Sequence, residues 1–333
     1  MAELLVEVFG GADPSEARGG DPSARELLDR GASRVLDERS RLEDSPDLRA
    51  SLLDVLGRVY GNLGDYRRAE QLLEQAQALF EESLRIRRER LGADHPLVPA
   101  TLNNLGLARL HQGDLAGAEE YLREAVSMRR AQLAADHPDL AQGLANLGYV
   151  SQVAGASTEA EALYREALEI RRRALDPSDP RIAQSLNNLG LLLVARGAPE
   201  NLREAEIQLR DALEQVRRTL GDRHPLWATG QNNLGLVLLR LNRAEEARAS
   251  YAAALALRRD ILPEGHPHTA YALLGLGQSL TALGGEENLR EAEQHLREAL
   301  AIREKTLPSG HRLIAETEAA LAAWRTVSGA PGR

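Results

Sequence analysis

Three residue types are scarce or missing: the 333-residue chain has no cysteine, one lysine (Lys305) and only 3% aromatic residues. The absence of cysteine excludes disulfide bonds, thiolate metal sites and a cysteine nucleophile. A core of leucine, alanine and valine with few large rings suits thin, repeated helix packing better than one bulky globule. No uninterrupted run of about 18 apolar residues occurs, so the sequence predicts no membrane-spanning helix.

The overall composition, 43% hydrophobic and 27% charged, is typical of a soluble, folded protein. A net charge of −9 argues against a nucleic-acid partner, because phosphate binding needs a basic face. The opening MAELLVEVFGGADP carries Glu3 and Glu7 and no basic leader, so we expect no signal peptide and a cytoplasmic protein.

A repeat runs along the chain, marked by a proline at a regular place in each unit. The prolines are Pro96, Pro138, Pro180, Pro225 and Pro267, with Arg312 at the same place in the last unit. The spacings are 42, 42, 45, 42 and 45 residues, and both longer ones come from three extra residues at one turn. Such an array favours one α-solenoid over two globular domains.

Each unit is predicted to form two helices. The residue before the proline is the expected N-cap of the first helix, since proline suits the first helical position. These N-caps are His95, His137, Asp179, His224 and His266. The first helix should end at residues that tolerate the left-handed conformation, namely Gly64, Gly113, Gly155, Gly197, Asn242 and Gly284.

We predict a flexible segment over 1–21, a capping helix over 22–41, the solenoid over 46–310, a closing helix over 311–327 and a flexible tail over 328–333. The predicted units span about 46–95, 96–137, 138–179, 180–224, 225–266 and 267–310.

The recurring letters L-x-x-L-G, a turn glycine, Ala-Glu, then A-L-x-I-R-x-x-x-L-G-x-D-H-P resemble the tetratricopeptide repeat, and more narrowly its 42-residue, kinesin-light-chain-like kind, also found in many bacterial proteins. The resemblance covers about residues 46–327. It implies an all-α, right-handed superhelix of about six helix-turn-helix repeats. The stretch FGGADPSEARGGDPSARELLDRGA, followed by LLDVLGRVYGNLGDYRRAE, resembles the repeat region of bacterial serine/threonine kinases, although the chain has no kinase signature.

Two adjacent asparagines recur in the first helices, as in TLNNLG at 101–106. Leu102, Leu105 and Gly106 form the buried stripe there, so Asn103 and Asn104 lie about 110° and 150° from its centre, on the far face. In tetratricopeptide proteins this face lines the concave groove. The implied peptide-binding residues are Asn103, Asn104, Leu107, Gln142, Asn146, Tyr149, Gln184, Asn187, Asn188, Leu191, Asn232, Asn233 and Leu236, with Thr229 and Tyr271 on the same face.

An asparagine amide can donate to and accept from the backbone of an extended peptide. The same amide can instead bond a neighbouring helix, and the sequence leaves both roles open. The ladder stops at the ends, with Asp54-Val55 in the first unit and Leu274-Gly275 in the sixth.

Other candidates favour structural roles. The arginine pairs Arg87-Arg88, Arg129-Arg130, Arg171-Arg172, Arg217-Arg218 and Arg258-Arg259 are interpreted as solvated heads near helix C-termini. The histidines before proline lie a repeat apart and do not converge on a metal, and Trp227 and Trp324 should pack in the fold. We predict no catalytic site, no cofactor and no metal.

The sequence therefore predicts a non-catalytic scaffold or adaptor whose concave groove binds a peptide or protein segment. The alternatives are a regulatory module of a bacterial kinase-linked or transcription-linked signalling protein, and a structural spacer that self-associates.

Overall fold

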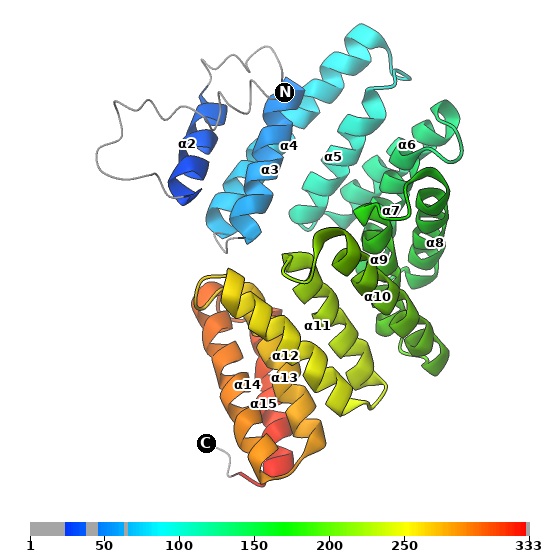
Figure 1. The fold of residues 1–333 in the computed structure, drawn as a ribbon. Helices are drawn as coiled ribbons and strands as arrows, with labels where there is room; N and C mark the ends of the chain where they lie inside the picture. Colours follow the sequence, from blue (N-terminus) through cyan, green and yellow to red (C-terminus); the bar gives the residue numbers. More distant parts are fainter. Residues whose placement is uncertain (1–23, 38–45, 63–65, 331–333) are drawn as a thin grey trace. The chain divides into compact units, whose positions relative to one another are not determined.

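The computed structural model describes residues 24–37, 46–62 and 66–330, and all of the regular structure in these ranges is helical (Figure 1). The helices belong to two compact units that divide between Leu133 and Ala134. In each unit consecutive helices pack against one another in pairs. The predicted all-α fold of helix pairs is confirmed.

The first unit contains five of the described helices. They are α2 (Ala24–Leu36), α3 (Pro46–Asn62), α4 (Tyr66–Leu91), α5 (Val98–His111) and α6 (Leu115–Gln132). The pairs α3–α4 and α5–α6 are the first two repeats. Their apolar faces bury one cluster that includes Leu53, Phe80 and Leu102.

The second unit contains four helix pairs and a closing helix. These are α7 (Pro138–Val153), α8 (Ser157–Ala174), α9 (Pro180–Arg196), α10 (Pro199–Leu220), α11 (Pro225–Arg240), α12 (Ala244–Ile261), α13 (Pro267–Leu283), α14 (Glu286–Thr306) and α15 (Arg312–Ser328). The first helices of neighbouring repeats also touch directly, in the order α7, α9, α11, α13, α15. They therefore share a surface.

The seam within a repeat depends on the glycine of L-x-x-L-G. A Cβ on Gly190 of α9 would lie 2.7 Å from Cγ of Leu209 on α10. Only glycine lets the two helices approach this closely. Leu186 and Leu189 are buried beside it, as the helical wheel predicts.

The predicted N-caps are confirmed at four of the five positions. The side chains of His137, Asp179, His224 and His266 each accept a hydrogen bond from the backbone N–H two residues ahead. His311 caps α15 in the same way, although no proline follows it. The bond satisfies a backbone donor that the first turn of a helix leaves without a partner.

His95 differs. The prediction that it caps a helix beginning at Pro96 is wrong, because α5 begins at Val98 and its N-cap is Leu97. A second proline, Pro99, occupies the first turn of α5, where its missing N–H is not needed. Nδ1 of His95 still accepts from the N–H of Leu97, at 3.3 Å.

The ends of the first helices agree with prediction. Gly113, Gly155, Gly197, Asn242 and Gly284 all have positive φ angles, from 59° to 85°. Gly64 lies outside the described residues. Both tryptophans pack in the fold: Trp324 is buried and donates to the carbonyl of Leu289 at 2.7 Å, and Trp227 packs partly buried on the core.

Helix α2 lies within the predicted capping segment 22–41, and α15 overlaps the predicted closing helix 311–327. The capping roles and the repeat boundaries given above remain predictions. The predicted flexible segment 1–21 lies outside the described residues, as do residues 331–333 of the predicted tail. None of the described helices is long and apolar enough to cross a membrane.

Candidate functional site

In the second unit the predicted groove residues lie on three first helices that follow one another. On α7, Gln142 and Asn146 are half-buried and Tyr149 is 49% exposed. On α9, Gln184 is exposed, while Asn187, Asn188 and Leu191 are half-buried. On α11, Asn232 is buried and Asn233 and Leu236 are half-buried.

The amides in this surface partly bond one another. Nδ2 of Asn233 donates to Oδ1 of Asn187 at 2.6 Å, which joins α11 to α9. Nε2 of Gln142 donates to Oδ1 of Asn146 at 3.0 Å within α7. One of the two roles left open by the sequence, a bond between neighbouring helices, is thus present at the Asn187–Asn233 pair.

Asn103, Asn104 and Leu107 belong to α5 of the first unit. Asn103 is buried, and its Nδ2 lies 3.5 Å from Oδ1 of Asn104, while Asn104 and Leu107 are half-buried. Contact of any of the predicted groove residues with a ligand stays a prediction.

The arginine pairs require a correction. The prediction that both heads are solvated is wrong for the first arginine of three pairs, because Arg129, Arg171 and Arg258 are buried. The side chains of Arg171 and Arg258 leave the second helix of one repeat at a point where the first helix of the next repeat covers them. Arg303 is buried in the same way, but the pair pattern misses it because Glu304 follows it.

Arg171, Arg258 and Arg303 contact the helix that follows. Nη1 of Arg171, only 1% exposed, donates to the carbonyl of Arg181 at 2.9 Å and to Oγ of Ser185 at 2.8 Å. In the three pairs with a buried first arginine, the second arginine is exposed, as predicted; Arg259, for example, forms an ion pair with Glu298 at 2.8 Å. Arg217 and Arg218 are both exposed, because Val216 holds the buried position in that repeat.

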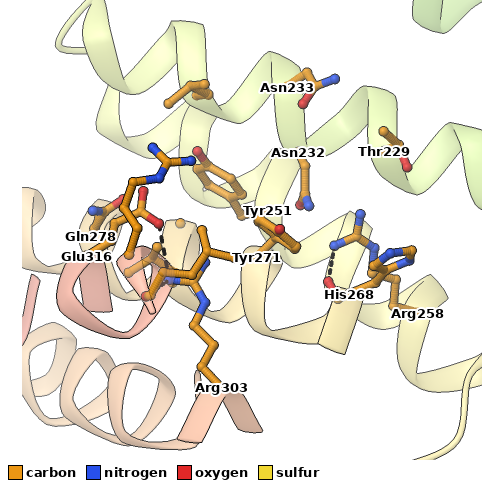
Figure 2. Close-up of a pocket in the computed structure, with 15 residues that line it drawn as sticks. Thr229, Asn232, Asn233, Tyr251, Arg258, His268, Tyr271, Gln278, Arg303 and Glu316 are labelled. Atoms are coloured by element: carbon orange, nitrogen blue, oxygen red, sulfur yellow. Dashed lines mark hydrogen bonds and ion pairs between the residues drawn. The ribbon is translucent and has the colours of Figure 1, made fainter. Parts of the chain in front are cut away.

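A cavity of about 570 Å³ lies on the first-helix surface of the second unit (Figure 2). Five helices, α11 to α15, contribute to its wall. The lining residues are Thr229, Asn232, Asn233, Leu236, Tyr251, Arg258, His268, Tyr271, Leu274, Gly275, Gln278, Arg303, Arg312, Leu313 and Glu316. Asn232, Asn233 and Leu236 are the predicted groove residues that the cavity brings together.

Tyr251 of α12 forms part of the floor. Its ring fills the place where a side chain at position 275 would stand, since a Cβ on Gly275 would lie 2.1 Å from Cε1 of Tyr251. Burial raises the pKa of the Tyr251 phenol, so the ring stays uncharged. The ring of Tyr251 thus occupies the space that an asparagine side chain at position 275 would need.

Arg258 is held by neutral acceptors. Its Nη1 donates to the carbonyl of His268. The amide oxygen of Asn232, when it faces Arg258, accepts from both terminal nitrogens of that residue, at 2.7 and 3.0 Å. Figure 2 draws the amide in the opposite orientation. Burial lowers the pKa of Arg258 to about 10, which leaves it charged at neutral pH.

Arg303 and Arg312 complete the basic part of the wall. Nη1 of Arg303 donates to the carbonyl of Leu313 at 2.6 Å and pairs with Glu316 at 3.1 Å, and its guanidinium carbon lies 5.3 Å from the centroid of the Tyr271 ring. Arg312 is exposed. Burial, and then the proximity of His266 and Arg258, lowers the pKa of His268, which favours its neutral form.

The sequence pattern missed Tyr251, Arg258, Gln278, Arg303, Arg312 and Glu316. Five of these come from second helices or from the closing helix, which the first-helix wheel does not include. One sequence signal could have identified Arg258 and Arg303. An arginine recurs through the chain ten residues before a residue near the beginning of the helix that follows. Within the described ranges no cluster of three or more histidine, aspartate or glutamate side chains could hold a metal ion.

Helix pairs in tandem, with a cavity on the shared surface of their first helices, define a helical-repeat protein. The tetratricopeptide repeat profile matches residues 57–131, 98–152, 139–201, 198–260 and 228–305, which together cover well over half of the chain. The chain belongs to the tetratricopeptide repeat family, whose fold is typical of protein–protein interaction scaffolds.

Solved structures share the fold at low identity. BtubC (BKLC) from P. vanneervenii is 24% identical, with a TM-score of 0.59 over 72% of this chain and 95% of that one. Kinesin-light-chain TPR-like repeats from Podosopora anserina are 22% identical, with a TM-score of 0.52 over 65% and 96% of the chains. The apo form of RapI is 16% identical, with a TM-score of 0.56 over 87% and 79%.

The fold is thus similar to that of kinesin-light-chain-like tetratricopeptide proteins, as the repeat length predicts. No curated protein matches the chain in sequence. The resemblance of the N-terminal stretch to kinase repeat regions stays a prediction, and residues 1–23 lie outside the described ranges.

Proposed function

We propose that this chain is a non-catalytic scaffold that binds a peptide or protein segment along the first-helix surface of residues 134–333, with the cavity of α11 to α15 as its principal anchoring point. The observation that carries this proposal is the cavity itself. Its volume of about 570 Å³ lies within the range of specific ligand sites, and its wall combines apolar, aromatic and convergent polar groups.

The neighbouring surface supports a bound segment longer than the cavity. Tyr149 on α7 and Gln184 on α9 are exposed, so their side chains are available to a ligand. Asn188 and Leu191, both half-buried on α9, add a polar and an apolar group. Backbone contacts by amides and pockets for alternate side chains are what an extended peptide requires.

A peptide-display selection against the full chain provides the ligand for the test. The affinity of a selected peptide is then measured for two variants that add the same side chain to one repeat. Thr229→Trp places an indole at the cavity wall, and Ala256→Trp places it at an exposed position of α12 that does not line the cavity. We expect Thr229→Trp to weaken binding about tenfold or more and Ala256→Trp to leave it unchanged.

The predicted ladder is tested with Asn187→Ala combined with Asn188→Ala. We expect weaker peptide binding, with helicity by circular dichroism unchanged. The proposal fails if the selected peptides bind the wild type and all of these folded variants equally well, because the ligand would then lie elsewhere.

A further inference from the structure

His266 caps the helix α13, which contributes several residues to the cavity wall. Its side chain is buried, and its Nδ1 accepts the backbone N–H of His268 at 3.1 Å. Pro267, the first residue of α13, has no N–H, so the N–H of His268 is the first donor that the helix must satisfy. A ring nitrogen that accepts a hydrogen bond carries no proton, so His266 is neutral in this arrangement and its proton lies on Nε2.

Protonation of His266 removes this cap. The added proton binds Nδ1 itself and turns the acceptor into a donor, which then faces the N–H of His268. The new positive charge also lies at the N-terminus of α13, where the helix dipole is positive. Both effects loosen the start of α13. His268 and Tyr271, which lie there, form part of the cavity wall (Figure 2).

The surroundings of this cap oppose a further positive charge. The rings of His266 and His268 lie 5.0 Å apart, and Nη1 of Arg258 on α12 donates to the carbonyl of His268. Burial, and then His266 and Arg258, lowers the pKa of His268. The other titratable or charged side chains of this region are Tyr271 on α13, Arg303 on α14, Arg312 and Glu316 on α15, and the exposed Glu264 two residues before the cap. Glu316 is paired with Arg303 at 3.1 Å, so cations outnumber carboxylates around the two histidines.

The chain also contains a cap of the same geometry that does not titrate near neutral pH. Oδ1 of Asp179, the N-cap of α9, accepts the backbone N–H of Arg181 at 2.9 Å. A hydrogen bond from the Arg181 side chain lowers the pKa of the Asp179 carboxyl, so this cap persists in mildly acidic solution. The cap of α13 therefore responds to a pH range in which the cap of α9 is constant.

We propose that His266 is a pH-sensitive cap that controls the order of the start of α13 and, through it, the cavity. Above about pH 7 the neutral ring holds the first turn, and below about pH 6.5, where a free histidine side chain is half-protonated, the proton displaces the cap. The capped ring binds the proton less readily than an uncapped one, so the capped form is favoured at the higher pH. The inference names a regulation of the proposed site and rests on the proposed function for its effect on binding.

The first test needs no ligand. Hydrogen exchange of the full chain, followed by mass spectrometry, gives the protection factors of the amides of residues 268–271 at pH 7.5 and pH 5.5. A protection factor is taken relative to the intrinsic exchange rate at the same pH. We expect a loss of protection of about tenfold at pH 5.5, because losing an N-cap corresponds to a factor of roughly 2 to 30.

Variants assign the proton to His266. His266→Asn keeps a neutral acceptor at the cap and should remove the pH response, whereas His266→Ala should lack the protection at both pH values. His268→Gln leaves its backbone N–H in place, so the response should persist. The matched control is His137→Asn, the same substitution at the cap of α7, which does not line the cavity and should leave the response of α13 unchanged.

The second test links the cap to the cavity. A selected peptide without histidine, aspartate or glutamate should bind the wild type severalfold more weakly at pH 5.5 than at pH 7.5. His266→Asn should remove most of this loss, because His266 is the most buried of the histidine caps on the helices that line the cavity, which are His224, His266 and His311.

Three outcomes overturn the proposal. Equal protection of residues 268–271 at both pH values shows that the cap does not titrate in this range. An equal loss of protection in the wild type and His266→Asn places the proton on another group. If protection falls with pH but peptide affinity does not, the cap does not regulate the cavity, and the proposed function stands as long as Thr229→Trp weakens binding. If Thr229→Trp has no effect on binding, the proposed function fails and the regulation of the site fails with it, whatever the exchange data show.

Discussion

At position 275, glycine replaces the asparagine that recurs in the first helices. The equivalent residues in the preceding four repeats are Asn104, Asn146, Asn188 and Asn233. Gly275 is different because the ring of Tyr251 stands where its Cβ would be, and the same ring lies against Gly235 on α11. An asparagine at position 275 would therefore clash with the ring of Tyr251, whereas Asn188 is present although Tyr164 holds the equivalent place in the repeat before it.

Gly275→Asn should accordingly destabilise the second unit by about 1–3 kcal/mol, the usual range for overpacking a buried site. Combining it with Tyr251→Leu should restore much of the loss, because the smaller side chain leaves room at position 275; leucine holds the equivalent place at Leu122, Leu209 and Leu296, and tyrosine holds it at Tyr164. Urea unfolding of the single and double variants measures both effects. A Gly275→Asn protein as stable as the wild type would contradict the steric explanation.

Between elements, four arginines each join a second helix to the helix that follows it. Arg87, Arg171, Arg258 and Arg303 each donate to the carbonyl ten residues ahead. Arg87, Arg171 and Arg303 also reach a hydroxyl fourteen residues ahead, on Thr101, Ser185 and Thr317. In the repeat where Val216 replaces the arginine, the residue fourteen positions ahead is Gly230 and carries no hydroxyl group. The donor and the acceptor are therefore both absent from that repeat.

The joint between α8 and α9 can be tested by a double-mutant cycle. Arg171→Val should cost about 1–3 kcal/mol, because it leaves the carbonyl of Arg181 and the hydroxyl of Ser185 without their donor. Ser185→Ala removes one of these acceptors, so the double variant should lose less than the sum of the single losses, by about 0.5–1.5 kcal/mol. The free energies come from urea unfolding, and strict additivity would show that the two side chains are not coupled.

For the whole molecule, two clusters of buried apolar residues in the described ranges share no member, and buried residues such as Leu122 and Leu144 belong to neither. One cluster lies between Ala32 and Ala125, and the other between Ala160 and Trp324. In repeat proteins stability is approximately a sum of local terms, so separate clusters allow separate unfolding.

We therefore expect the full chain to unfold in two steps. Leu102→Ala removes a fully buried side chain of the first cluster, and Leu273→Ala does so in the second. Each should cost about 2–5 kcal/mol and move only one of the two steps in urea unfolding followed by circular dichroism. A matched control is Ile207→Ala, which truncates an exposed side chain and should move neither. A single transition that both buried substitutions shift equally would contradict the expectation.

Much of the fold was predictable because its signals are local. The histidine that caps α7 and the glycine that follows it act on backbone groups within a few residues, so His137 and Gly155 could be identified from the letters alone. The helical wheel likewise identified Leu186 and Gly190 as the seam. The start of α5 was misplaced because two prolines, Pro96 and Pro99, compete for the first turn.

The candidate site was predictable only in part. The wheel placed Asn232, Asn233 and Leu236 on the surface that the cavity occupies, but it could not supply Arg303 or Arg312, which come from later helices. The prediction that the Arg171 head is solvated was wrong for the same reason. The next repeat decides whether the end of a second helix is exposed or buried.

The sequence by itself determined the repeat, the pairing of helices and the positions of their caps, since these depend on spacing and on contacts within a turn. The tertiary structure decided which arginines are buried, which amides bond one another and where a cavity opens. Those features depend on side chains that lie from 10 to about 90 residues apart in the chain and meet only after the repeats have stacked. The neighbouring repeat determines where a long arginine side chain or a tyrosine ring lies, so a local sequence pattern does not predict it.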